Sequence, residues 1–203
     1  MNLQKGEVIC LLGRNGAGKT TTLRSIMGFT PPRKGSIKFE GADLAKMPPY
    51  EICRLGIGYV PQDRRIFPTL SVEDNLEVVE RKVEGGWTVE KIFCAFPILE
   101  PLKSRKGRHL SGGEQQILAV ARPLMTNPKL LLLDEPSEGL APLIVRAIEE
   151  LVKSIITTGI SVILAEQNMR FAMNIAQRGY IIDKGRIHHQ GTIEELKEDK
   201  EII

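Results

Sequence analysis

The sequence has no long apolar run, little aromatic character and few cysteines. Of its 203 residues, 5% are aromatic and three are cysteines: Cys10, Cys53 and Cys94. Cysteines that are odd in number and far apart match neither a disulfide framework nor a zinc site, so we expect free thiols in a reducing cytosol. Because no membrane-spanning run or signal-peptide pattern is present, we expect a chain that neither crosses a membrane nor is exported by itself.

The charge balance is nearly neutral. Twenty-eight basic and 25 acidic residues give a formal net charge of +3, an excess too small to indicate a nucleic-acid partner. Hydrophobic residues make up 42% of the chain, as in ordinary globular proteins. At this length the chain can bury a sizeable core, as one domain or as one domain with a subdomain.

Apolar segments alternate with segments of helical spacing. Residues 7–12 and 130–133 are apolar without alternation, which is typical of strands buried on both faces. We therefore predict an α/β fold with a mostly parallel sheet flanked by helices. Further strands are expected at 36–40, 57–60, 161–165, 180–182 and 186–189, and helices at about 143–157, 169–177 and 193–198. Residues 71 to about 106 are expected to form a helical insert.

The segment after the first strand fits the pattern G-x-x-x-x-G-K-[ST]. Its glycines let backbone N–H groups approach phosphate oxygens, and the helix N-terminus that follows favours negative charge. We expect Lys19 to reach the β- and γ-phosphates of a nucleotide and Thr20 to ligate Mg²⁺. The alternative, an ordinary glycine turn with a surface lysine, fits the flanking strand and helix less well. The residues expected to bind the phosphates are Gly13, Arg14, Asn15, Gly16, Ala17, Gly18, Lys19, Thr20 and Thr21.

Two carboxylates end the apolar strand at 130–133. An acidic residue at the end of a central strand beside a phosphate loop is a site for Mg²⁺, which we assign to Asp134. We expect Glu135 to be the general base that orients and deprotonates the attacking water. Alternatively, both acids cap the next turn and Pro136 ends the strand. The phosphate loop elsewhere in the chain favours the functional interpretation.

The segment 110–116 opens another helix. Ser111 and Glu114 have the spacing of a capping box, which by itself explains both residues. Capping does not require Gly112 and Gly113, and glycine in a helix costs about 1 kcal/mol relative to alanine. A capped helix start with exposed N–H groups can bind an anion, so we expect a second phosphate contact at Ser111, Gly112 and Gly113.

The three motifs resemble, in order and spacing, those of ABC transporter ATPase subunits, over nearly the whole chain. The resemblance implies a P-loop NTPase fold with a short antiparallel portion and a helical signature subdomain at about 64–126. These would lie in a single ATPase domain, 1–203, that is short at its N-terminus. It also implies a head-to-tail dimer in which Ser111, Gly112 and Gly113 of one subunit contact the γ-phosphate bound by the other. Gln62 is then expected to sense Mg²⁺ and the attacking water, together with the metal ligands Thr20 and Asp134.

Residues 58–68, 134–142 and 166–168 resemble more narrowly the ATPases of branched-chain amino acid importers. This resemblance implies hydrolysis of ATP with Mg²⁺, coupled to transport at the cytoplasmic face of the cell membrane. The implied partners are a second ATPase subunit, identical or not, two membrane permeases and, indirectly, an extracytoplasmic solute-binding protein. The insert from about residue 64 to 106 would hold a cytoplasmic helix of the permease. ATPases of urea importers, and soluble ABC ATPases without a permease, are the alternatives.

Three features depart from the family pattern. Gln167 stands where the family usually has a histidine that contacts the γ-phosphate, but this glutamine is characteristic of the importer branch, so we keep it as a catalytic residue. No aromatic residue precedes Gly6 to stack on adenine, which predicts weak discrimination between ATP and GTP. Pro123 falls within the helix predicted after residue 111, where proline costs about 3 kcal/mol unless the helix kinks.

Overall fold

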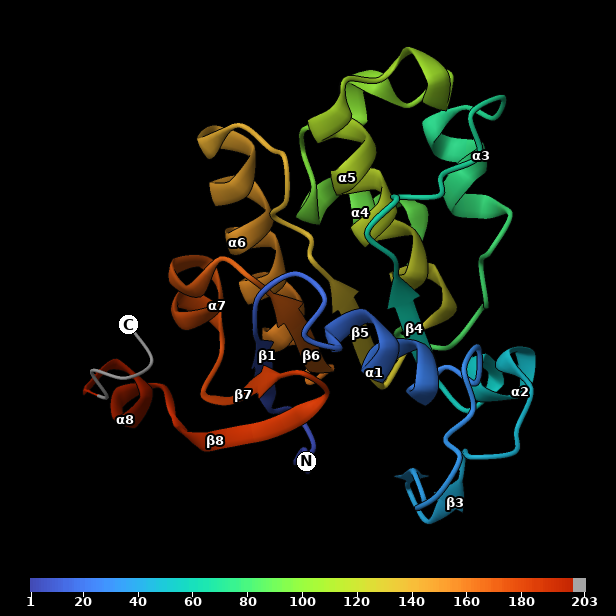
Figure 1. Ribbon diagram of the computed structural model, residues 1–203. Helices are drawn as coiled ribbons and strands as arrows, with labels where there is room; N and C mark the ends of the chain where they lie inside the picture. Colours follow the sequence, from blue (N-terminus) through green and yellow to red (C-terminus); the bar gives the residue numbers. More distant parts are fainter. Residues whose placement is uncertain (199–203) are drawn as a thin grey trace.

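A computed structural model describes residues 1–198 of the chain. Within these residues a six-stranded sheet has the order β4-β5-β6-β1-β7-β8, and all neighbouring strands are parallel except β7 and β8 (Figure 1). This confirms the predicted α/β class with its mostly parallel sheet. The strands are β1 (Val8–Leu12), β4 (Ile57–Val60), β5 (Leu130–Asp134), β6 (Ser161–Glu166), β7 (Arg178–Asp183) and β8 (Arg186–Thr192).

Helices cover both faces of the sheet, which is why its central strands are apolar throughout. Ile9 and Leu11 of β1 pack into one hydrophobic cluster with Leu23 and Ile26 of the helix α1. The other β1 side chains pack into a second cluster, with residues of α6 and α7. The flanking helices are α1 (Lys19–Ile26), α2 (Pro49–Arg54), α6 (Pro142–Thr157), α7 (Met169–Ile175) and α8 (Ile193–Glu198).

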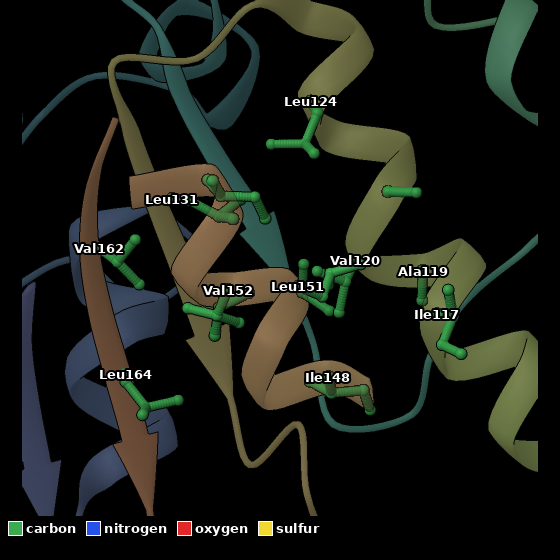
Figure 2. Close-up of a cluster of buried hydrophobic side chains, with 14 of the residues drawn as sticks. Ile117, Ala119, Val120, Leu124, Leu131, Ile148, Leu151, Val152, Val162 and Leu164 are labelled. Carbon is green, nitrogen blue, oxygen red and sulfur yellow. The ribbon is translucent and has the colours of Figure 1, made fainter. Parts of the chain in front are cut away.

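The second cluster forms the larger part of the core. Figure 2 shows Leu131 of β5 and Val162 of β6 facing Leu151 and Val152 of α6. Each buried aliphatic side chain of this kind stabilises the fold by about 1.5–3 kcal/mol relative to its exposed state. The helix α5 reaches the same cluster through Val120, so the segment before β5 is held against the sheet by continuous apolar packing.

The segment between β4 and β5 is helical, as predicted. Its α-helices α3 and α4 lie beside α5 at one side of the sheet (Figure 1). The elements are α3 (Val72–Glu77), α4 (Val89–Ala95), α5 (Gly112–Ala121) and the 3₁₀ turns η1 (Glu100–Leu102), η2 (Gly107–His109) and η3 (Arg122–Thr126). A separate two-stranded antiparallel pair, β2 (Lys38–Phe39) and β3 (Ala42–Asp43), replaces the longer strand expected at 36–40.

Pro123 lies in a 3₁₀ helix that continues directly from α5, which corrects the predicted α-helical position. The α-helix α5 ends at Ala121 and the chain tightens into η3, with Pro123 in the first turn of that 3₁₀ helix. The N–H of Arg122 still donates to the carbonyl oxygen of Leu118 in α5, so proline at position 123 removes the N–H that would continue this series of bonds. The change from α-helix to 3₁₀ helix at this point meets the condition of the prediction, in which the cost of about 3 kcal/mol applies unless the helix is distorted. Separately, none of the helices in residues 1–198 is long and apolar enough to cross a membrane.

Candidate functional site

The loop from Gly13 to Gly18 connects β1 to α1 at the carboxyl end of the parallel strands. Gly16 and Gly18 have φ angles of 79° and 112°, which L side chains rarely adopt. Gly13 is glycine for a different reason: a Cβ atom there would lie 2.4 Å from the carbonyl oxygen of Ile182. The predicted phosphate loop is thus a tight turn whose glycines are required by the backbone and by its contact with β7.

Lys19 begins α1 and folds back over the loop. Its ammonium donates to the carbonyl oxygens of Gly13 at 2.7 Å and Arg14 at 3.1 Å, and it pairs with Oε1 of Glu135 at 2.8 Å. The two charged side chains are only 3% and 7% exposed. A buried ammonium held by three oxygens at the mouth of a glycine loop is a cation positioned for an anionic ligand. That ligand must compete with the carboxylate of Glu135 for Lys19.

Asp134 lies next to this pair and is fully buried. Oγ1 of Thr20 donates to its Oδ1 at 3.0 Å, and the hydroxyl of Tyr59 donates to its Oδ2 at 2.9 Å. Burial raises the pKa of Asp134, and the two hydrogen bonds oppose that shift. A carboxylate and a hydroxyl at the edge of a phosphate loop form an oxygen-only donor set, which suits Mg²⁺. Thr20 and Asp134 therefore fit the predicted metal role.

Glu135 occupies an unusual backbone conformation. Its φ angle is 49°, in the left-handed region, and its N–H donates to the carbonyl oxygen of Ala165 at 2.8 Å. A non-glycine residue in this region carries strain of about 1–3 kcal/mol, which the surrounding structure must offset. This left-handed conformation turns the backbone sharply after Asp134. As a result the carboxylate of Asp134 reaches Thr20, and that of Glu135 reaches Lys19.

Glu166, at the end of β6, is a residue that the sequence analysis did not select as a site residue. Its carboxylate is 2% exposed and accepts hydrogen bonds from the backbone N–H groups of Ser137 at 3.0 Å, and of Gln167 and Asn168 at 3.1 Å each. Burial raises the pKa of Glu166. Its position links the loop after β5 to the loop that carries Gln167, whose side chain is exposed. The sequence signal that could have identified Glu166 is an acidic residue directly after the mostly apolar strand predicted at 161–165.

The capping box at Ser111 is present as predicted. Glu114 N–H donates to Oγ of Ser111 at 3.3 Å, and the Ser111 N–H donates to the Glu114 carboxylate at 2.6 Å. Gly113 also has a packing reason, because a Cβ atom there would lie 2.8 Å from the side chain of Ile144. Ser111 and Gly112 are exposed. Among the described residues, the hydrogen bonds of Ser111 stay within its own helix start and do not reach the phosphate loop.

Gln62 is exposed and lies beside the loop that follows β5. Its amide donates a short hydrogen bond to the carboxylate of Glu138, and both residues line a cleft of about 570 Å³ between the helical segment and the loop after β5. The structure thus brings together the phosphate loop, Asp134 and Glu135 within one chain. It places Gln62 in the adjacent cleft, and Ser111 and Gly112 at the exposed start of α5.

Comparison with known proteins gives consistent matches. The family model described as ABC transporter matches residues 1–138. The chain is 42% identical over 190 residues to the high-affinity branched-chain amino acid transport ATP-binding protein BraG of Pseudomonas aeruginosa, covering 92% of this chain and 82% of the relative. It is 34% identical over 212 residues to the lipopolysaccharide export system ATP-binding protein LptB of Escherichia coli, covering 100% of this chain and 86% of the relative.

Solved structures match along the same length. The ADP conformation of MJ1267, an ATP-binding cassette of an ABC transporter, superposes with a TM-score of 0.83 at 28% identity, covering 100% of this chain and 88% of that one. The post-hydrolysis dimer of the cassette MJ0796, bound to ADP and Pi, gives a TM-score of 0.83 at 24% identity, with 95% and 88% covered. Because the identity to MJ0796 is below 25%, this match supports the fold but not a function.

Proposed function

Because the chain belongs to the ABC transporter family and is an ATPase, we propose that it binds and hydrolyses ATP to drive an importer of branched-chain amino acids. The observation that carries the proposal is the 42% identity to an importer ATPase along 92% of this chain. It is supported by a site in which a phosphate loop, a buried lysine and two strand-end carboxylates lie together.

The phosphate end of ATP would bind over the loop from Gly13 to Gly18. Backbone N–H groups of the loop and the N-terminus of α1 supply hydrogen bonds and a favourable dipole. The Lys19 ammonium would move from Glu135 to the β- and γ-phosphates, because the carboxylate and the phosphates are anions that compete for it. That exchange would free Glu135 to accept a proton from the attacking water. Arg14, Asn15 and Ala17 of the loop, with Thr21 in the first turn of α1, would complete the phosphate-binding segment.

The Mg²⁺ ion would be held by Thr20 and Asp134, with Gln62 approaching from its cleft. When bound, Mg²⁺ neutralises part of the phosphate charge during the displacement. Thr20 already donates to Asp134, so the two oxygens that would ligate the metal are adjacent before it arrives. Gln167 would donate a hydrogen bond to the γ-phosphate without adding positive charge.

ATPases of this family work as dimers joined to membrane permeases. We place Ser111, Gly112 and Gly113 against the nucleotide of a second ATPase subunit, identical or different, because Ser111 and Gly112 are exposed at a capped helix start. Two permeases would then hold the dimer at the cytoplasmic face of the membrane, through the helical subdomain at about 64–126. A solute-binding protein would act indirectly, from the opposite face of the membrane.

A second candidate function is lipopolysaccharide export, because the chain is also 34% identical over its full length to an export ATPase. The ATPase does not bind the transported solute, so the same site residues are compatible with import and with export. The partner proteins therefore decide between the two functions.

Affinity capture from membranes of the native cell, with ATP and the Glu135→Gln variant, tests the proposal. Loss of the proposed base should trap the ATP-bound dimer and retain its partners. Glu194→Gln is the matched control, because it makes the same chemical change on an exposed carboxylate in α8, away from the proposed site residues. We expect two permeases and a solute-binding protein that binds leucine, isoleucine or valine. Lipopolysaccharide-export partners would support the second candidate, and soluble partners alone would contradict both.

A further inference from the structure

The two oxygens of Asp134 have separate hydrogen-bond donors from separate elements. Thr20, at the start of α1, bonds Oδ1 at 3.0 Å, and Tyr59, in β4, bonds Oδ2 at 2.9 Å. The carboxylate is fully buried, so it has little access to water as an alternative donor. Its orientation is therefore set by these two hydroxyl groups.

Side-chain packing does not explain why residue 59 is a tyrosine rather than a phenylalanine. The other β4 residues, Ile57, Gly58 and Val60, are buried and carry no polar side-chain group. The ring of Tyr59 lies beside the ring of Phe29, with centroids 6.1 Å apart, and phenylalanine would fill the same space. The phenol has a proton to donate and the carboxylate accepts, so Tyr59 is the donor in this hydrogen bond.

The two hydrogen bonds differ in what happens when a metal binds. Thr20 is itself a proposed metal ligand, so its hydroxyl oxygen would turn its lone pairs toward Mg²⁺, and its bond to Oδ1 would be altered. Tyr59 lies on the opposite side of the carboxylate, bonded to Oδ2, and this bond can persist. We propose that Tyr59 is a positioning residue that holds the Asp134 carboxylate in its metal-binding orientation. The inference rests on the metal role of Asp134 given under the proposed function.

Binding of Mn²⁺ and ADP, with Mn²⁺ as the spectroscopic substitute for Mg²⁺, tests this role directly. Electron paramagnetic resonance of free Mn²⁺ gives the affinity of the protein–ADP complex for the metal. For Tyr59→Phe we expect this affinity to fall about tenfold, as for other hydrogen-bond partners of metal ligands. The affinity for ADP in the presence of a chelator should stay unchanged, because Tyr59 acts through Asp134 and not on the phosphate. The Mg²⁺ concentration for half-maximal ATP hydrolysis should rise by the same factor.

Tyr180→Phe is the matched control. Tyr180 is also buried, and its hydroxyl bonds to Asn2, so the control removes the same group without removing a hydrogen bond to Asp134. Because each variant deletes one oxygen and keeps the ring, both should fold, and thermal melting checks this. Unchanged metal affinity in Tyr59→Phe, or an equal loss in Tyr180→Phe, would overturn the inference alone. If the unaltered protein binds ADP with no dependence on metal, the proposed metal site fails as well.

Discussion

The buried pair of Lys19 and Glu135 predicts that the Glu135→Gln variant is less stable without nucleotide but binds nucleotide more tightly. The pair is separated by 2.8 Å, and both side chains are almost inaccessible to solvent. Removing one partner leaves the Lys19 ammonium with only the carbonyl oxygens of Gly13 and Arg14. The neutral amide of glutamine cannot replace the lost charge, so the remaining cation is only partly compensated.

The magnitude follows from the burial of the pair. Breaking a buried ion pair costs about 3–5 kcal/mol, and the two carbonyl acceptors of Lys19 favour the lower end, about 3 kcal/mol. For a chain of this length each kcal/mol changes the melting temperature by about 2–4 °C, so we expect a fall of about 6–12 °C. Phosphate binding in the variant avoids competition with Glu135. If the whole difference is recovered, nucleotide affinity rises by up to about 100-fold.

Thermal melting without nucleotide and titration with ADP measure the two effects. Glu194→Gln again serves as the control, because its carboxylate is exposed on α8 and its loss should cost less than about 1 kcal/mol. The hydrolysis rate of Glu135→Gln should fall by about 10²–10⁴-fold, as expected for a general base. A melting temperature and an ADP affinity both equal to those of the control would refute the reasoning.

Three further predictions concern Cys10, Glu166 and Glu7. Burial raises the pKa of Cys10 to about 12, so a thiol reagent should label only the two exposed cysteines until the protein is unfolded. Glu166→Gln should lower the free energy of unfolding by about 1–3 kcal/mol in urea denaturation, since an amide cannot accept every bond from Ser137 and the following backbone. The hydrogen bond from Arg178 lowers the pKa of Glu7, so its stabilisation is present at neutral pH and declines as the pH falls below 4.5. In urea denaturation, the difference between Arg178→Gln and the unaltered protein should be largest at pH 7 and shrink as the pH is lowered below 4.5.

Much of the fold was predictable because its signals are local. The apolar runs of β1 and β5, the glycine loop and the capping box at Ser111 each depend on residues within a few positions of one another. Their order along the chain then specifies a parallel sheet with a phosphate loop at its carboxyl edge. The change from α-helix to 3₁₀ helix before Pro123 was less predictable, because it depends on how that segment packs against β4.

The sequence by itself determined which residues could carry the chemistry: a loop for phosphate, two carboxylates at a strand end and a lysine. Only the tertiary structure decided their partners. Tyr59 reaches Asp134 because β4 pairs with β5 in register, and Lys19 reaches Glu135 because the backbone turns sharply at φ 49°. The tyrosine contact joins residues 75 positions apart. Local patterns cannot specify such contacts, because they depend on which strands are neighbours and on how the side chains between them pack.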